Sequence, residues 1–118
     1  MGCEMQRRRT SRSVPKKAVS VQLLLDGYIA AYGSVEDLSL GGARLAIGED
    51  APSAEEIEIC IAAEDRNALS FHTTAKVVWC QPATSADGRH LWGVHWTHFP
   101  KTAKHVLEAL IAHACKEV

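Results

Sequence analysis

The chain has 118 residues, of which 47% are hydrophobic and 23% are charged, a composition typical of one globular domain with room for a hydrophobic core. No apolar run approaches the ~18 residues that a membrane helix needs, and polar residues separate the basic N-terminus from the first apolar stretch, so we expect neither a membrane helix nor a secretory signal. The net charge of −1 excludes a uniformly basic or acidic chain.

The charge is unevenly distributed along the sequence. Residues 1–17 contain six basic side chains and one acidic one, whereas the rest contains seven basic and thirteen acidic residues. A basic segment on an acidic body indicates contact with an anionic ligand or surface. Residues 1–16 lack apolar periodicity and end near Pro15, so we interpret them as a flexible N-terminal segment. The alternative is a solvated, disordered arm without a ligand.

The domain proper spans residues 17–118 and opens with a series of short candidate strands. The first two flank Asp26-Gly27, a dipeptide typical of hairpin turns. A later stretch alternates strictly, with Ile57, Ile59 and Ile61 on one face, which predicts a half-buried strand. In chain order the expected strands are 18–25, 28–37, 43–47, 56–62, 69–81 and 89–97. Short strands joined by turns favour an antiparallel barrel or sandwich.

The end of the chain has a different period. After Pro100 the apolar residues recur at helical spacing on one face, namely Val106, Leu107, Leu110, Ile111 and Ala114. We therefore expect one amphipathic helix at about 100–117, packed on the sheet. Trp92 and Trp96 share a face of the last strand and are expected to face the core or this helix.

Neither the cysteines nor the histidines form a recognisable site. The four cysteines have no C-x-x-C spacing, and Cys60, Cys80 and Cys115 lie in apolar stretches, so we expect buried free thiols and a reducing, cytoplasmic location. His95 and His98 are three apart on a strand and face opposite ways, so we expect no metal. No nucleophile elbow, metalloprotease helix or phosphate loop motif appears, so we expect no enzyme.

Two short motifs carry the strongest functional indication. The first is the arginine cluster Arg7, Arg8, Arg9 and Arg12; the second is the stretch Asp37-Leu38-Ser39-Leu40-Gly41-Gly42. Guanidinium forks bind phosphate oxygens and the O6/N7 edge of guanine bidentately. A carboxylate can accept from guanine N–H groups, and glycines allow a ligand to approach the backbone. Together they predict a site for a phosphorylated guanine nucleotide.

The pattern Arg8-x-x-x-Arg12 followed by Asp37-x-Ser39-x-x-Gly42 resembles the signature of PilZ domains, bacterial receptors for cyclic di-GMP. The resemblance covers most of the chain and implies a mainly β fold, a six-stranded antiparallel barrel with a C-terminal α-helix. It also implies a non-catalytic module without a cofactor, in which cyclic di-GMP changes the conformation and thereby regulates a partner protein in motility, biofilm formation or polysaccharide secretion.

The resemblance implies a set of ligand contacts. Arg8 and Arg12 occupy the motif positions, Arg9 often accompanies them, and an arginine at the position of Arg7 goes with a stacked ligand dimer. Trp79 matches a tryptophan that packs on guanine in some members. The full expected set is Arg7, Arg8, Arg9, Arg12, Asp37, Ser39, Gly41, Gly42 and Trp79.

Other interpretations remain open from the residues alone. Asp37 and Ser39 can instead bond their own backbone in an ordinary turn, and Trp79 can pack in the core. At the level of function, the domain can be a PilZ-like adaptor that has lost nucleotide binding, or the basic segment can bind a nucleic acid, although the acidic body opposes a long polyanion.

Overall fold

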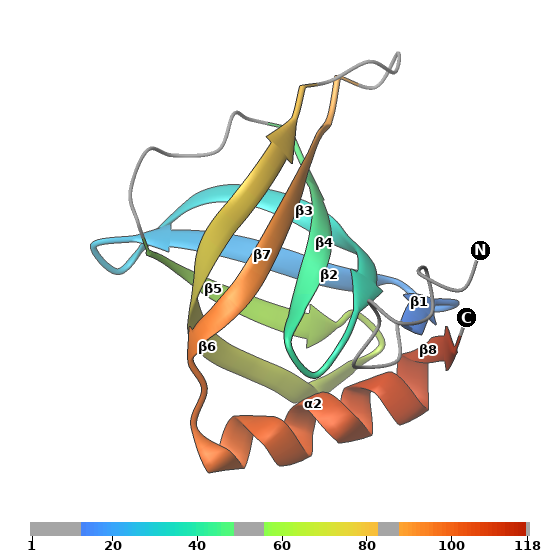
Figure 1. Ribbon diagram of the computed structural model, residues 1–118. Coiled ribbons are helices and arrows are strands. Elements are labelled where there is room, and N and C mark those ends of the chain that lie inside the picture. The colour runs from blue at the N-terminus through green and yellow to red at the C-terminus, as the bar shows by residue number, and fades with distance from the viewer. Residues whose placement is uncertain (1–12, 49–55, 83–87, 118) are drawn as a thin grey trace, which may run out of the picture.

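The computed structural model describes residues 13–48, 56–82 and 88–117, and most of them lie in β-strands (Figure 1). In chain order the elements are β1 (Ser13–Pro15), β2 (Val19–Leu25), β3 (Tyr28–Leu38), β4 (Gly42–Ile47), β5 (Ile57–Ala63), β6 (Arg66–Gln81), β7 (His90–His98), α2 (Lys101–Ala114) and β8 (Cys115–Glu117). All six strands expected from the sequence are present, each within a few residues of its predicted bounds. The β2–β3 turn has positive φ at Asp26 (51°) and Gly27 (83°), as the Asp-Gly dipeptide predicts.

Six strands close into an antiparallel barrel. The hydrogen-bonded order is β2-β5-β6-β7-β4-β3, and β3 pairs back with β2 to close the ring. Figure 1 shows these strands wrapping around a common interior, with α2 lying across one end. The predicted fold class, a six-stranded antiparallel barrel with a C-terminal helix, is therefore confirmed.

The barrel interior is filled by the alternate residues of each strand. Ile57, Ile59 and Ile61 of β5 are at most 2% exposed, as their alternation predicts. Trp92 and Val94 of β7 also point inward and are at most 1% exposed. Because inward side chains alternate with outward ones, residues on the other face of β7 belong to the outer wall of the barrel.

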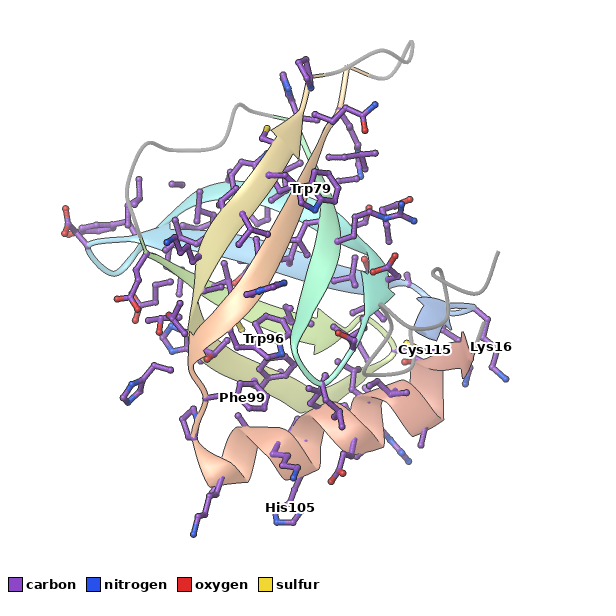
Figure 2. The ribbon with its side chains drawn as sticks, viewed as in Figure 1. Lys16, Trp79, Trp96, Phe99, His105 and Cys115 are labelled. Atoms are coloured by element: carbon purple, nitrogen blue, oxygen red, sulfur yellow. The ribbon has the colours of Figure 1, made fainter. Side chains whose placement is uncertain are left out.

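Helix α2 covers the end of the barrel with its apolar face. Leu107 and Leu110 are fully buried. Phe71, Trp96 and Phe99 form an aromatic cluster with ring centroids 5.6–5.7 Å apart. Figure 2 shows Trp96 and Phe99 between the barrel and the helix. The helix-facing role expected for Trp96, and the core role for Trp92, are confirmed.

The two ends of the described chain differ from the sequence expectation. The helix was expected to reach about residue 117, but it ends at Ala114, because Cys115–Glu117 forms β8 and pairs with β1. Both Lys16 N–H and Lys17 N–H donate to the Ala114 carbonyl, at 2.8 and 3.1 Å, which satisfies a helix-end acceptor. Ser13–Pro15, assigned above to the segment 1–16, is thus a paired strand; residues 1–12 lie outside the described residues.

The cysteines are free but not uniformly buried. Cys115 is buried and Cys60 half-buried, and burial raises the pKa of both thiols. Cys80 is exposed, so the expectation that it is buried was wrong: it lies near the end of β6, where the barrel wall no longer covers it. Cys3 lies outside the described residues. Within the described part of the chain, no helix is long and apolar enough to span a membrane.

Candidate functional site

The predicted site residues fall into two groups. Arg7, Arg8, Arg9 and Arg12 precede Ser13, the first described residue, so their placement is not tested. The other five lie in the barrel wall: Asp37 at the end of β3, Ser39, Gly41 and Gly42 in the β3–β4 turn and start of β4, and Trp79 near the end of β6.

Ser39 organises the β3–β4 turn. Its backbone N–H donates to the Gly42 carbonyl at 2.9 Å. Its Oγ accepts from the N–H groups of Gly41 (3.3 Å) and Gly42 (3.2 Å). This is the local role of a turn serine that the sequence left open as an alternative. The turn is therefore held in shape by hydrogen bonds among its own residues.

Gly42 is required by the packing of two strands. A Cβ at this position would lie 2.0 Å from the Val94 carbonyl oxygen, because β4 and β7 approach each other closely here. The sequence motif predicts a glycine that lets a ligand approach the backbone; at Gly42 the neighbouring strand by itself excludes a side chain. A Cβ at Gly41, by contrast, would meet nothing within 4 Å.

Asp37 does not bond its own backbone but faces an arginine on the next strand. Its carboxylate Oδ2 lies 3.2 Å from Arg44 Nε. Only 8% of the Asp37 side chain is exposed, against 39% of the Arg44 side chain. Among the described residues Arg44 Nε meets no acceptor in hydrogen-bond geometry, so the contact is an ion pair. Sequence reasoning missed Arg44, because nothing but the β3–β4 register reveals that it lies opposite Asp37.

Trp79 lies on the outer wall of the barrel. The residue is 43% exposed, and Figure 2 shows its side chain outside the barrel beside β7. A Cβ added to Gly93 of β7 would lie 2.1 Å from Trp79 Nε1, so the indole rests over Gly93. The alternative of core packing does not apply to Trp79.

The first described strand, β1, lies beside the β3–β4 corner. Ser13 pairs with Leu38, the residue between Asp37 and Ser39. Arg12 directly precedes Ser13 in the chain. The described chain therefore begins beside the second sequence motif, at the residue between Asp37 and Ser39.

Comparison with models of protein families shows to which family the chain belongs. The model described as PilZ domain matches residues 6–113, most of the chain and both motifs. The chain belongs to the PilZ domain family. The resemblance inferred from the arginines and the Asp37–Gly42 stretch is confirmed.

Solved PilZ structures share the fold. The PilZ domain of YcgR from Escherichia coli, solved with c-di-GMP, is 20% identical, with a TM-score of 0.63 over 91% of this chain and 90% of that one. The PilZ domain of CeSA from a cellulose-synthesising bacterium is 21% identical (TM-score 0.54; 86% and 94% covered). PlzA of Borreliella burgdorferi, solved with c-di-GMP, is 12% identical (TM-score 0.59; 92% of this chain, 52% of PlzA). No curated protein matches by sequence.

The remaining described residues of this PilZ domain contain few clusters of ionisable side chains. Within residues 13–48, 56–82 and 88–117 no three His, Cys, Asp or Glu side chains gather as metal ligands. One ionic cluster joins separate elements: Asp65, in the β5–β6 turn, lies 3.0 Å from His113 of α2 and 3.7 Å from Lys17. The hydrogen bond from His113, with the charges of His113 and Lys17, lowers the pKa of Asp65.

Proposed function

We propose that this PilZ domain is a receptor for cyclic di-GMP that changes conformation on binding and so regulates a partner protein. The main support is the pairing of Ser13 with Leu38, because it brings the start of the described chain beside Asp37 and the Ser39–Gly42 turn. Two of the related structures, the YcgR domain and PlzA, were solved with c-di-GMP, which supports the same ligand here.

The proposed contacts follow from the charges of the ligand. Cyclic di-GMP carries two phosphates and two guanines, so several permanent planar cations are needed, and Arg8 and Arg12 supply them, with Arg9 and Arg7 adjacent. Asp37 accepts from guanine N1–H and N2–H. Trp79 presents an exposed ring on which a base can stack. Ser39 acts through the shape of the turn, given its bonds to Gly41 and Gly42.

The proposed role is that of a binding module without catalysis, acting in the cytoplasm. The output is motility, biofilm formation or polysaccharide secretion through a protein partner. Ordering the N-terminal segment on the ligand costs ~1–2 kcal/mol for each residue fixed, and charge-assisted hydrogen bonds of ~1.5–3 kcal/mol each recover this cost. Binding and ordering are therefore coupled, which supplies the conformational change.

Isothermal titration of the purified protein with cyclic di-GMP tests the proposal. We expect saturable binding by the wild type and loss of most of the affinity in Arg8→Ala and in Arg12→Ala, with unchanged circular dichroism. Lys104→Ala, which removes an exposed charge on α2, is the matched control and should bind as the wild type does. Unchanged binding in both arginine variants would reject the assigned roles.

One observation favours a second candidate, a PilZ-like adaptor without nucleotide binding. The Asp37 carboxylate is already paired with Arg44 and largely buried, and Ser39 is engaged in its own turn. Both groups can therefore serve the fold alone. The same titration separates the candidates, because an adaptor gives no heat with cyclic di-GMP at saturating concentrations.

A further inference from the structure

Four strands place a row of residues on the outer wall of the barrel. Asp37 of β3 pairs with Arg44 of β4, Arg44 with Gly93 of β7, and Gly93 with Trp79 of β6. Residues directly opposite each other in a sheet have side chains on the same face. Neighbouring strands are ~4.8 Å apart, so the row follows the curved wall for roughly 14 Å from the backbone of Asp37 to that of Trp79, over half of the six-stranded ring.

The Trp79 end of the row is shaped by an irregularity and a glycine. A register shift between Val77 and Trp79 leaves Val78 as the extra residue of a β-bulge, a feature that redirects the side chains next to it. The indole then extends over Gly93, where a Cβ would lie 2.1 Å from Nε1 and 2.2 Å from Cε2. The ring therefore leans from β6 across β7 towards β4, the strand that carries Arg44.

At the other end, the contact of Arg44 with the described residues runs through only one of its nitrogens. Its ion pair with Asp37 is made through Nε, and a guanidinium has five N–H donors in a rigid fork. The Asp37 side chain is 8% exposed and that of Arg44 39% exposed. A ligand that approaches the outer wall thus meets the Arg44 guanidinium beside the edge of the carboxylate.

In the orientation in which N1–H and N2–H of guanine meet Asp37, guanine presents its O6 acceptor to Arg44. Adenine in that orientation presents its amino donor to Arg44 and its N1 acceptor to Asp37, and it matches the pair only when it is turned so that the amino group meets Asp37. We propose that Arg44 donates to O6 of the guanine whose N–H groups Asp37 accepts, and that Arg44 makes the site select guanine over adenine. Trp79, which packs over Gly93, stacks on the face of a base and makes no hydrogen bonds to its edge, so it does not distinguish guanine from adenine. This inference rests on the proposed function.

The test compares cyclic di-GMP with cyclic di-AMP by isothermal titration of the whole chain. The two ligands carry the same phosphate charge, so a loss of general electrostatic attraction lowers both affinities by one factor. We expect Arg44→Gln to weaken cyclic di-GMP about tenfold or more and to reduce the ratio of the two affinities by a similar factor. Arg66→Gln, at the opposite end of β6 from Trp79, is the matched control.

A second variant controls for the loss of the Asp37–Arg44 ion pair, which could by itself change the stability or shape of the site in Arg44→Gln. Arg44→Lys keeps the charge beside the carboxylate but loses the fork, so it should remain folded by thermal unfolding and still lose selectivity. Gly93→Ala displaces the indole and should weaken both ligands with an unchanged ratio, while Gly48→Ala, where a Cβ meets nothing within 4 Å, should bind normally.

The outcomes distinguish this inference from the function on which it rests. A wild type that ignores cyclic di-GMP overturns both. A wild type that binds cyclic di-GMP, with Arg44 variants that keep the wild-type ratio of affinities, overturns the role of Arg44 alone. If Arg44→Gln and Arg44→Lys lower the affinity for both ligands by the same factor, a hydrogen bond from Arg44 to O6 is also rejected. Arg44 would then act only on the shape or charge of the site.

Discussion

At the scale of single residues, the site depends on which positions lack a side chain. Gly42 and Gly41 are neighbours, yet only Gly42 faces an atom that excludes a Cβ, the carbonyl oxygen of Val94. The distinction comes from the direction of the Cβ: at Gly42 it would point at the β7 backbone, whereas at Gly41 it would point into open space, although Trp96 N–H of β7 bonds the Gly41 carbonyl. The turn beside Asp37 is therefore held in shape by strand packing as well as by Ser39.

We predict that Gly42→Ala destabilises the protein, because β4 and β7 must separate to admit the methyl group. The expected loss is about 1–3 kcal/mol of the free energy of unfolding, the range of overpacking in a close-packed site. Urea unfolding followed by circular dichroism measures it. Gly41→Ala is the control and should change the midpoint little; equal midpoints for the two variants would contradict the close approach.

At the scale of elements, the ends of the domain are held together by one hydrogen-bonded unit. Strand β1 pairs with β8, and the segment after β1 bonds the last carbonyl of α2. Figure 2 shows Lys16 and Cys115 close together at this place. The Asp65, His113 and Lys17 side chains add an ionic contact between the β5–β6 turn, the helix and the chain leading into β2.

The pKa of Asp65 gives this contact a pH dependence. The pKa of Asp65 is lower in the folded state than its value of ~3.9 in the unfolded chain. Such a carboxylate stabilises the fold fully when the pH lies above the unfolded pKa, and the stabilisation is lost as the pH falls towards the lower pKa of the folded state. We therefore expect Asp65→Asn to be less stable than the wild type at pH 6 and the difference to shrink below about pH 4. Thermal unfolding at a series of pH values measures it.

The control for this prediction is Glu64→Gln, which removes the exposed acidic side chain next to Asp65. It should leave the pH dependence of the wild type unchanged. A difference between Asp65→Asn and wild type that stays constant from pH 6 to pH 3 would show that Asp65 acts by packing or backbone effects instead of by its charge.

At the scale of the whole molecule, strand β1 connects the barrel with the short strand β8 that follows the helix. Ser13 contacts β3, and Pro15 pairs with Cys115 after the helix. Strand β1 therefore connects the Asp37 corner of the barrel with the end of the helix, and under the proposed function a ligand bound at this corner would act on that junction.

We predict that cyclic di-GMP increases the hydrogen-exchange protection of residues 6–12, because charge-assisted bonds to the arginines order a polar segment. Exchange measured by mass spectrometry with and without ligand tests this. The inward residues of β5 serve as an internal control and should be protected in both states. Equal protection of the segment in both states, at saturating ligand, would reject ordering as the source of the conformational change.

Much of this architecture could be predicted from the amino-acid sequence. The alternation of Ile57, Ile59 and Ile61, the Asp26-Gly27 turn and the helical spacing of Leu107 and Leu110 are local patterns, and each matches the structure. Family membership also followed from the sequence, because the fixed spacing of arginines, carboxylate and glycine is itself local. These features need no knowledge of which strands become neighbours.

Only the tertiary structure decided the features that depend on strand pairing. The row from Asp37 through Arg44 and Gly93 to Trp79 comes from two pairs of consecutive strands, β3–β4 and β6–β7, that lie far apart in the chain, and its alignment is fixed by register and by bulges. The β1–β8 pair, which shortened the helix, likewise joins opposite ends of the sequence. Composition and periodicity determine which face of a strand is apolar, whereas contacts between distant segments form only when the barrel closes.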